Sequence, residues 1–478
     1  MICYNESMMI DFYELTMANA YFLENRSEEI VYFDLYYRNN PDHGGYAIFV
    51  GLESIVNYIE NINFTKDEIE FLESKNLFDK GFLKYLENFK FTGDIFAFKE
   101  GSVIFPNEPI ITVKAKIIEA QIIETYLLQS INHQSLIATK ASRMKYAAKN
   151  RIILEMGARR AHGLTSSILG ARAAYIGGVD GSSNILSDQA YHIPSSGTMA
   201  HSFVQLFDNE YEAFQSYAKI YPNNSTFLVD TYDTLKSGVI NAIKVIKEIL
   251  IPLDAKNYAI RIDSGDLTYL AKKARLMLDE AGLNECKIIV SNSLDERLIE
   301  TLINQEAPID IFGVGERLIT AKSDPVFGSV YKLVALEVSG EIVPKIKISD
   351  NPEKVTTPHF KQVYRIYTEN NKSEADLITL YDEIIDSSNP LTIFDEHNTW
   401  KTKTFENFTI KKLHTQIFKK GIRVYELPSI DEVKAYAAKE LDTLWDEVRR
   451  FDYPHKYYVD LSKKLWLIKK ELLEEQRL

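Results

Sequence analysis

Between residues 151 and 337 the sequence repeats one pattern: a short apolar run, a few small or polar residues, and then a helix-like stretch. The last four of these runs begin 32, 29 and 22 residues apart, which is close to the length of one strand-and-helix unit. Strands that alternate with helices in this way pair in parallel. The pattern therefore predicts an α/β fold with an irregular, TIM-like barrel. The five runs are 152–155, 226–229, 258–262, 287–290 and 309–312.

The segments on either side of this repeat mix helix-like and strand-like patterns. Apolar periodicity over 12–22 predicts a helix, and alternation over 30–37 predicts a strand. We therefore expect an N-terminal α+β domain over 1–130, an α/β barrel domain over 131–345 and a C-terminal α+β segment over 346–478.

Helix boundaries are marked most clearly at two places. Asp266 suits an N-cap before an apolar stripe that begins at Leu267, and Gly282 suits the stop. Ser429 and Glu432 form a capping box ahead of a stripe that we expect to continue from Val433 to Val448. Pro454 separates this helix from the last one.

Composition excludes several classes of protein. With 478 residues, 45% of them hydrophobic, the chain has enough apolar material for two or three cores. A net charge of −13 argues against nucleic-acid binding, and the two cysteines give no disulfide framework. The N-terminus lacks a signal-peptide pattern, and no stretch approaches the ~18 apolar residues of a membrane span. We expect a cytoplasmic protein without nucleic-acid or membrane partners.

Charged and small residues gather where the apolar runs end. Active sites of α/β folds lie at this edge, because the carboxyl ends of the strands meet there. Together these residues suit a charged, phosphorylated substrate. They are Glu155, Arg159, Arg160, Asp230, Asp233, Arg261, Asp263, Ser264, Gly265, Asp266, Ser291, Asn292, Ser293, Gly313, Gly315 and Glu316.

Two of these segments suggest how such a substrate is bound. In IFGVGERLIT, Gly313 and Gly315 allow backbone N–H groups to approach phosphate oxygens. The alternative is that these glycines only form an ordinary turn between a strand and a helix. In IRIDSGDL, Arg261 and Asp263 alternate, so both point to one side, the cation toward an anionic ligand and the carboxylate toward ribose hydroxyls or Mg²⁺. A structural Arg–Asp ion pair is the alternative. Complete dinucleotide-binding and Walker motifs are lacking.

Two further residues carry no functional signal of their own. His201 lies among small residues and hydroxyls, where a single histidine is more often structural or simply exposed. Tyr13 lies in a helix-like segment, where an aromatic residue usually belongs to the core or to an interface.

The ordered set of motifs resembles the nicotinate phosphoribosyltransferase family nearly from end to end. No single motif is specific, but the order is. The matching segments are DFYELTMANAYF, GGYAIFVGLE, INHQSLIATKASR, EMGARRAHG, GTMAHSF, LVDTYDTLKSG, RIDSGDL, IVSNSLDE, FGVGERLIT, FGSVYKLV, YELPSIDEVKAY and LWDEVRRFDYP.

The resemblance implies an α/β sandwich-like domain, built from both ends of the chain, that packs on an irregular barrel in a homodimer. It implies transfer of a phosphoribosyl group from phosphoribosyl diphosphate to nicotinate, with Mg²⁺ as cofactor and ATP as co-substrate, in NAD salvage. By the family's motif His201 is the histidine that ATP phosphorylates, and Thr198 borders the pyridine ring.

Further roles follow from the resemblance and from the chemistry of the strand ends. Tyr13 is similar to the aromatic that stacks on the pyridine ring, often from the partner subunit. Arg261, Arg159 and Ser183 would bind the substrate, and Asp263 would orient ribose or the metal shell. The expected phosphate contacts are Ser291, Asn292, Gly313, Gly315 and Glu316.

Two positions depart from the family pattern. Met156 stands where related enzymes often have a phenylalanine, so a thioether replaces a ring. Glu316 stands where some members have a threonine on the sugar phosphate, so we expect only its backbone N–H to bind.

Three alternatives remain open. Asp180 could accept a hydrogen bond from an amide, which would favour nicotinamide as substrate. A quinolinate enzyme of the same general chemistry would need more cations. A binding protein on a decayed scaffold would keep phosphate affinity without turnover, against which the intact His201, Arg261 and Asp263 argue.

Overall fold

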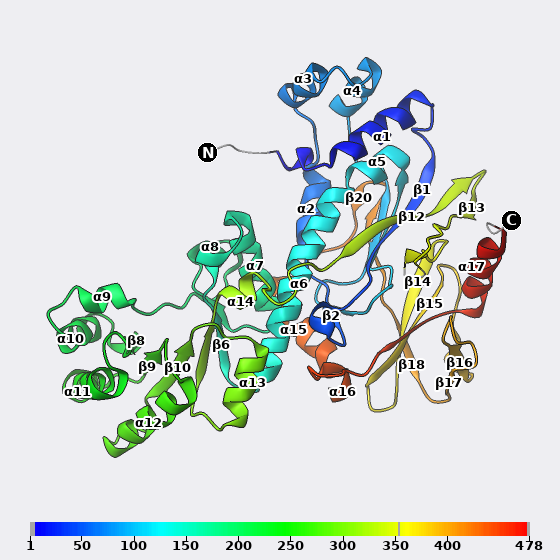
Figure 1. Cartoon of the computed structure of the whole chain (residues 1–478). Helices are drawn as coiled ribbons and strands as arrows, with labels where there is room; N and C mark the ends of the chain where they lie inside the picture. The colour runs from blue at the N-terminus through cyan, green and yellow to red at the C-terminus, as the bar shows by residue number, and fades with distance from the viewer. Residues whose placement is uncertain (1–4, 352–353, 476–478) are drawn as a thin grey trace. The chain divides into compact units, whose positions relative to one another are not determined.

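The computed structural model describes residues 5–351 and 354–475, so Cys3 lies outside the described residues. The chain divides into two compact units (Figure 1). The barrel unit is Ile137–Pro325, and the sandwich unit combines Met1–Leu136 with Val326–Leu478. The predicted fold class, an irregular α/β barrel plus an α/β sandwich-like part, is confirmed. The three-domain boundaries stay a prediction.

The barrel unit is built on a six-stranded sheet in which all neighbouring strands are parallel. The strand order is β7-β6-β11-β10-β9-β8, so the sixth strand returns to pair with the first. This order curls the sheet into a partial barrel, whose edge strands in the described chain are β7 and β8. The strands are β6 (Ile152–Glu155), β7 (Gly181–Ser182), β8 (Ser225–Leu228), β9 (Tyr258–Ile262), β10 (Lys287–Ser291) and β11 (Ile311–Val314).

The apolar runs located most of these strands. The expected bounds of β6 and β9 are confirmed, those of β8 and β10 differ by one residue, and β11 begins two residues later than expected. The pattern did not predict β7, because its two residues are glycine and serine and contain no apolar run.

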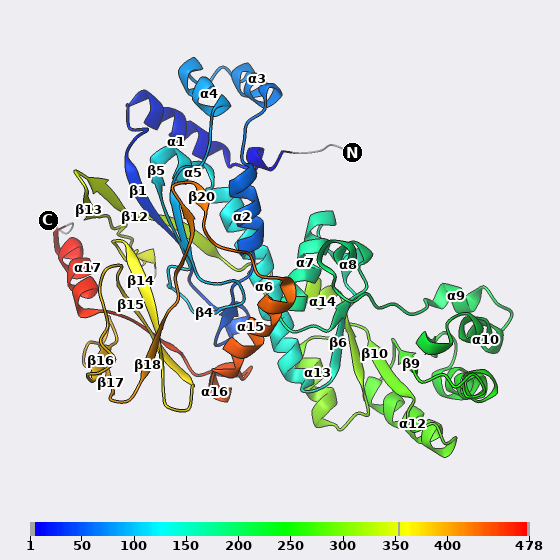
Figure 2. The same cartoon turned by 180° about the vertical axis from the view of Figure 1, so that it is seen from behind.

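Helices accompany the strands of the barrel unit, as the alternation predicted. Figures 1 and 2 show α12 and α13 beside the strands from both sides. The side chain of Asp266 caps α12 by accepting a hydrogen bond from the backbone N–H of Tyr269, and the apolar stripe of this helix is buried. The longer helices are α6 (Glu124–Ala148), which runs from one unit into the other, α7 (Leu164–Ile176), α8 (Ile185–Tyr191), α10 (Glu210–Ile220), α11 (Val239–Val245), α12 (Leu267–Glu280) and α13 (Glu296–Asn304).

The sandwich unit contains a seven-stranded antiparallel sheet whose order is β13-β12-β1-β5-β3-β19-β20. The N-terminal strands β1, β5 and β3 form its centre, and strands from the second segment flank them, because β12 pairs with β1 and β19 pairs with β3. Neither segment could complete this sheet alone. The strands are β1 (Ile30–Tyr37), β3 (Asp94–Ala97), β5 (Ile111–Lys116), β12 (Ser329–Val338), β13 (Glu341–Pro344), β19 (Thr415–Lys419) and β20 (Ile422–Arg423).

A second, four-stranded sheet of this unit has the order β18-β14-β15-β21. Its strands are β14 (Lys361–Tyr367), β15 (Ser373–Leu380), β18 (Thr409–Lys412) and β21 (Tyr458–Leu461). The principal helices are α1 (Phe12–Leu23), α2 (Leu52–Asn61), α3 (Lys66–Ser74), α4 (Lys80–Glu87), α15 (Ile430–Asp442) and α17 (Lys463–Glu475).

The capping box at Ser429 is confirmed, but the helix after it is shorter than predicted. α15 ends at Asp442, and a separate short helix, α16, spans Asp446–Arg449. The backbone of Trp445 is extended, with φ −70° and ψ 148°, and breaks the helix between them. Leu444 and Val448 are buried nevertheless. The apolar stripe therefore predicted correctly which residues are buried, but not that the helix breaks between them.

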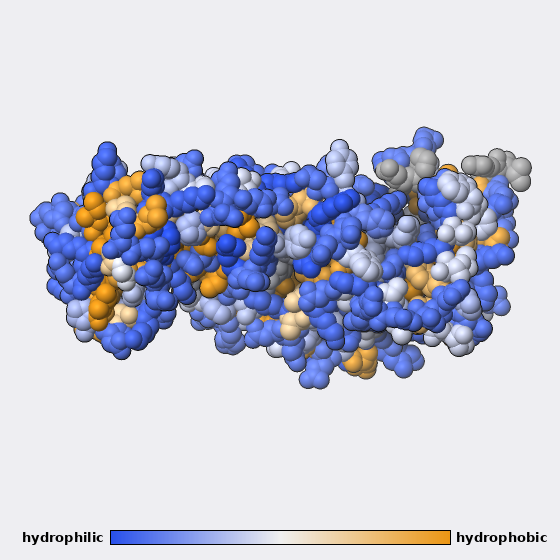
Figure 3. Space-filling model, turned by 90° about the horizontal axis from the view of Figure 1, so that it is seen from below, coloured by the Kyte–Doolittle hydropathy of each residue, from blue (hydrophilic) through white to orange (hydrophobic). Residues whose placement is uncertain are grey.

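The described surface gives no sign of a membrane-spanning helix. No helix in the described residues is both long and apolar enough to cross a bilayer. Figure 3 shows one face of the molecule, on which hydrophilic side chains predominate and hydrophobic atoms lie in separate groups.

A buried ion-pair network joins distant segments of the sandwich unit. The guanidinium of Arg365, on β14, is fully buried and lies 2.7 Å from Asp376 Oδ2 and 2.9 Å from Glu440 Oε2. It also donates a hydrogen bond of 2.9 Å to the carbonyl of Val103. Asp376 has Arg365 as its ion-pair partner, whereas Glu440 also pairs with Lys411, whose Nζ lies 2.7 Å from Glu440 Oε1.

We predict that Arg365→Met lowers the free energy of unfolding by about 3–5 kcal/mol, because it leaves the buried Asp376 without its cation and Glu440 with Lys411 alone. Urea unfolding followed by circular dichroism measures the loss. Arg423→Met, which breaks a partly exposed pair with Glu60, is the matched control and should cost about 0–1 kcal/mol. Equal losses in the two variants would contradict this account of the network.

Candidate active site

The carboxyl ends of the barrel strands bring together side chains from distant parts of the sequence. Because all six strands are parallel, the residues that end or follow them lie along one edge of the sheet. The predicted residues at this edge are Arg159, Ser183, Arg261, Asp263, Ser291, Asn292, Gly313, Gly315 and Glu316.

Arg261 is the centre of a hydrogen-bonded cluster at this edge. Its Nε donates to Ser291 Oγ at 3.0 Å, and its Nη1 donates to Thr198 Oγ1 at 3.0 Å. Its Nη2 donates to Asp263 Oδ1 at 3.2 Å, and the hydroxyl of Ser291 donates to the same oxygen. The Arg261 side chain is 15% exposed, so it is oriented by the protein while it remains open to a ligand.

Asp230, two residues after the end of β8, links this cluster to the loop that follows β9. Its Oδ2 accepts hydrogen bonds from the backbone N–H of Asp263 at 3.0 Å and from Ser264 Oγ at 2.5 Å. Its side chain is only 1% exposed, and its Oδ1 is buried without a hydrogen-bond partner among the described residues. A buried carboxylate oxygen in this state is available to a bound cation or donor.

His201 begins the short helix α9 (His201–Gln205) beside these carboxylates. Its Nδ1 lies 3.2 Å from Thr231 Oγ1. Its Nε2 lies 3.9 Å from both Asp230 Oδ1 and Asp263 Oδ2, and the side chain is 41% exposed. The ring is therefore accessible and faces two carboxylates with one edge.

Gly313, in β11, and Gly315, directly after this strand, lie close to a neighbouring loop. A Cβ on Gly313 would lie 2.9 Å from Met156 Sδ, and one on Gly315 would lie 3.2 Å from the Met156 carbonyl oxygen. Both glycines therefore pack closely against Met156. Glu316 is exposed, and its carboxylate pairs with Lys322 at 2.7 Å. The hydrogen bond from this lysine and its positive charge lower the pKa of Glu316.

The remaining predicted residues of the edge are exposed. Arg159 lies in the short 3-10 helix Ala158–Arg160 after β6, Ser183 follows β7, and Asn292 follows β10 with φ +90°. In the described residues no hydrogen bond joins Arg159, Ser183 or Asn292 to the Arg261 cluster. They border the same edge with side chains available to a ligand.

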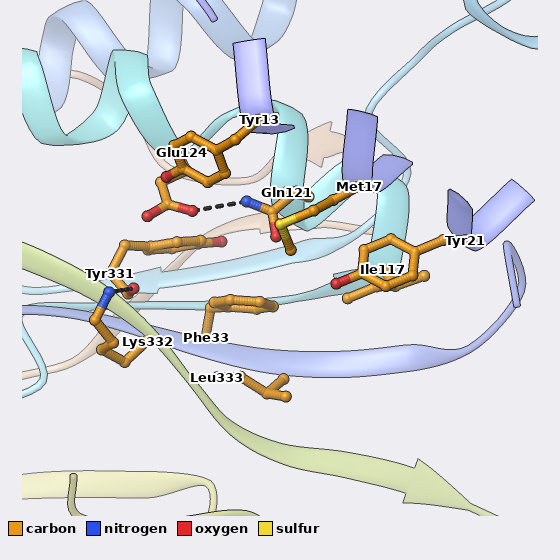
Figure 4. A pocket seen from close by; sticks show the side chains of 10 residues that line it. All are labelled: Tyr13, Met17, Tyr21, Phe33, Ile117, Gln121, Glu124, Tyr331, Lys332 and Leu333. Carbon is orange, nitrogen blue, oxygen red and sulfur yellow. Dashed lines mark hydrogen bonds between the residues drawn. The ribbon is translucent and has the colours of Figure 1, made fainter. Parts of the chain in front are cut away.

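Tyr13 lies in the sandwich unit, on α1. It lines a hollow of about 320 Å³ together with other aromatic and apolar side chains, as Figure 4 shows. Partial burial, with the negative charges of Glu124 and Glu14, raises the pKa of its hydroxyl. The hollow is lined by Tyr13, Met17, Tyr21, Phe33, Ile117, Gln121, Glu124, Tyr331, Lys332 and Leu333.

The structure thus joins four of the predicted residues, Thr198, Arg261, Asp263 and Ser291, directly by hydrogen bonds, with His201 next to them. Sequence reasoning placed Asp230 at this edge without an individual role and did not single out Thr231. The signal was present, since the DTYD segment follows an apolar run just as DSGD does, but the contacts with His201 required the structure.

Comparison with known proteins identifies relatives over the whole length. Family models described as the nicotinate phosphoribosyltransferase N-terminal domain, family and C-terminal domain match residues 8–132, 152–382 and 360–469. A nicotinate phosphoribosyltransferase of Bacillus subtilis (strain 168) is 47% identical over 471 residues, which cover 98% of this chain and 95% of the relative. The nicotinate phosphoribosyltransferase pncB2 of Mycobacterium tuberculosis (strain ATCC 25618 / H37Rv) is 38% identical, with coverage of 96% and 92%.

The fold is similar to a solved structure as well. A crystal structure of human nicotinic acid phosphoribosyltransferase aligns with 97% of this chain and 99% of its own, at a TM-score of 0.86 and 26% identity.

Glu14, next to Tyr13, gives a prediction about pH. Burial raises its pKa from 4.5 to about 8, while one oxygen accepts a hydrogen bond from Thr125. The unfolded chain releases this proton near the ordinary value and the folded chain holds it to higher pH, so the folded state loses stability as pH rises between the two values.

We therefore predict that the melting temperature of Glu14→Gln falls less than that of the wild type between about pH 5 and pH 8.5. Differential scanning fluorimetry across this range measures the difference. Glu24→Gln, at the exposed end of the same helix, should follow the wild type. If the wild type and Glu14→Gln lose stability in parallel, the buried carboxyl does not titrate as described.

Proposed function

The chain belongs to the nicotinate phosphoribosyltransferase family of enzymes, and on that premise we propose a reaction for the edge of the barrel described above. The enzyme transfers the phosphoribosyl group of phosphoribosyl diphosphate to nicotinate, giving nicotinate mononucleotide and diphosphate. ATP hydrolysis through a phosphohistidine at His201 is coupled to the transfer. The reaction would serve NAD salvage.

The observation that carries this proposal is the Arg261 cluster. Three donor groups of one guanidinium are aimed by Thr198, Asp263 and Ser291, so the cation is fixed before any ligand arrives. A preorganised cation stabilises developing negative charge without the cost of reorienting during the reaction. Its outer edge would bind an anionic oxygen of the substrate.

The charges at this edge favour a carboxylate substrate over an amide. Arg159 and Ser183 offer a cation and a hydroxyl, which suit the carboxylate of nicotinate. Asp180, the candidate acceptor for an amide, is already engaged: its Oδ2 accepts from Lys145 Nζ at 2.7 Å and from the backbone N–H of Ile153 at 2.8 Å. Its bonds near the beginning of β6 are structural, which disfavours nicotinamide.

In the transfer step, the pyridine nitrogen attacks the anomeric carbon of the ribose. The bond between that carbon and the diphosphate oxygen breaks, and the diphosphate leaves with the electron pair. No general base is needed, because the ring nitrogen is already nucleophilic. The protein would act mainly by positioning: Asp263 orients the ribose hydroxyls, while backbone N–H groups near Gly313 and Gly315, with Ser291 and Asn292, hold phosphate oxygens.

The surroundings of His201 support the proposed phosphohistidine. One ring nitrogen would attack the γ-phosphorus of ATP, and the bond to the β-phosphate oxygen would break to release ADP. Phosphorylation leaves the ring positively charged, and Asp230 and Asp263, each 3.9 Å from Nε2, stabilise that charge. This geometry favours Nδ1, the atom near Thr231, as the site of phosphorylation.

The donor set at this edge fits a Mg²⁺ ion bound together with substrate phosphates. Mg²⁺ prefers one or two carboxylates plus phosphate and water oxygens, and the buried Asp230 Oδ1 has no hydrogen-bond partner among the described residues. Asp230 and Asp263 would hold the ion, which would neutralise charge on the leaving diphosphate.

Tyr13 would complete the pyridine site by stacking on the ring. Its exposed aromatic face, with 47% of the residue accessible, is available for this contact. We propose that it acts across a homodimer, as the family resemblance implies.

The proposal is tested by measuring nicotinate mononucleotide formed from nicotinate, phosphoribosyl diphosphate and Mg²⁺, with and without ATP. We predict product from nicotinate but not from nicotinamide, and faster formation with ATP. In His201→Ala the rate with ATP should fall to the rate without it, because the phosphohistidine can no longer form.

His397→Ala, which alters a histidine that is 73% exposed in the sandwich unit, is the matched control and should keep the stimulation by ATP. Product from nicotinamide alone would overturn the assigned substrate. Tight binding of phosphoribosyl diphosphate without any product would instead indicate a binding protein on a decayed scaffold.

A further inference from the structure

Glu155, at the carboxyl end of β6, is a fully buried carboxylate beside the candidate active site. Its Oε2 accepts a hydrogen bond of 2.6 Å from Ser182 Oγ, and its Oε1 accepts one from the backbone N–H of Gly157. Burial raises its pKa. In the part of the chain that the structure describes, no cation forms an ion pair with it.

The two hydrogen bonds lead to two different loops. Gly157 begins the turn that carries Arg159, and Ser182 ends β7 just before Ser183. The backbone strengthens the second link, because the N–H of Ser183 donates to the carbonyl oxygen of Glu155 at 2.8 Å. One side chain therefore bridges the loop of the candidate cation and the loop of the candidate hydroxyl.

Ser182 extends this bridge by one further residue. Its hydroxyl also accepts a hydrogen bond of 3.0 Å from the backbone N–H of Asn184. The side chain of Asn184 in turn accepts from the backbone N–H of Leu186 and donates to the carbonyl of Ser167 at 3.2 Å. The loop after β7 is thereby fixed between β6 and α7.

A carboxylate that is buried without a cation lowers the stability of the fold. Burial disfavours its charged form, and a neutral side chain of the same size would pack there without that cost. What the carboxylate provides is two acceptor oxygens, one for each loop, which Gln lacks because one of its two groups is a donor. The chemistry thus indicates a role in positioning the loops.

We infer that Glu155 is a positioning residue for the pyridine substrate: it fixes the separation between the Arg159 loop and the Ser183 loop, and so sets how the substrate carboxylate is bound. The inference rests on the proposed function. It assigns no contact with phosphoribosyl diphosphate, because the Arg261 cluster is held by other residues.

The test compares Glu155→Gln and Ser182→Ala with the wild type, with steady-state kinetics for each substrate. We expect the KM for nicotinate to rise roughly tenfold to a hundredfold, because small displacements of positioning groups cost that much. The KM for phosphoribosyl diphosphate should rise by a clearly smaller factor, since the Arg261 cluster is held by other residues. Ser182→Ala removes a single hydroxyl, so its KM for nicotinate still tests the inference if Glu155→Gln folds poorly.

Glu210→Gln is the matched control. Glu210 is also a buried carboxylate of the barrel unit that accepts from a serine, Ser237, but it lies on α10 and contacts neither loop. Its substitution should leave the KM for nicotinate unchanged.

Equal effects on both KM values, or none in either variant while the wild type is active, would overturn the positioning role and leave the proposed function intact. A wild type that is inactive toward nicotinate would contradict the proposed function itself, so the two failures are distinguishable.

Discussion

The parallel pairing of β11 with β6 is the constraint on which the rest of the barrel unit depends. It brings the last strand of the unit back to the first, and so places the carboxyl ends of six strands along one curled edge. Arg261, Asp230 and Ser291 belong to three separate strand-and-helix units, yet they lie within hydrogen-bonding reach of one cluster. A chemical site of this kind follows from topology before any single side chain is considered.

The cluster itself is held in a state that a ligand can use. Arg261 is oriented by neutral hydroxyls and one carboxylate, while Asp230 keeps a buried oxygen without a hydrogen-bond partner among the described residues. Glu155 is likewise buried without a cation in the described chain. Such groups cost stability, in contrast to the buried carboxylates Asp376 and Glu440, which are paired with Arg365. Asp230 and Glu155 lie at the edge where phosphate, ribose and carboxylate would bind.

The sequence predicted the parallel strands well because each is a short apolar run that ends in polar residues, as in Tyr258–Ile262 before Asp263. It did not reveal β7, whose Gly181–Ser182 has no apolar signal, or the break at Trp445, which is set by backbone conformation. Arg261 and Asp263 could be named from their alternation. Asp230 and Thr231 could not be placed beside His201, because that contact joins segments 30 residues apart through the fold.

The most direct test of the central claim is a crystal structure of the enzyme with nicotinate mononucleotide and diphosphate bound. This account predicts that the product lies at the carboxyl edge of the barrel strands, with an anionic oxygen within hydrogen-bonding distance of Arg261 and the pyridine carboxylate near Arg159 and Ser183. Product bound elsewhere, with the Arg261 cluster unchanged and unliganded, would contradict it.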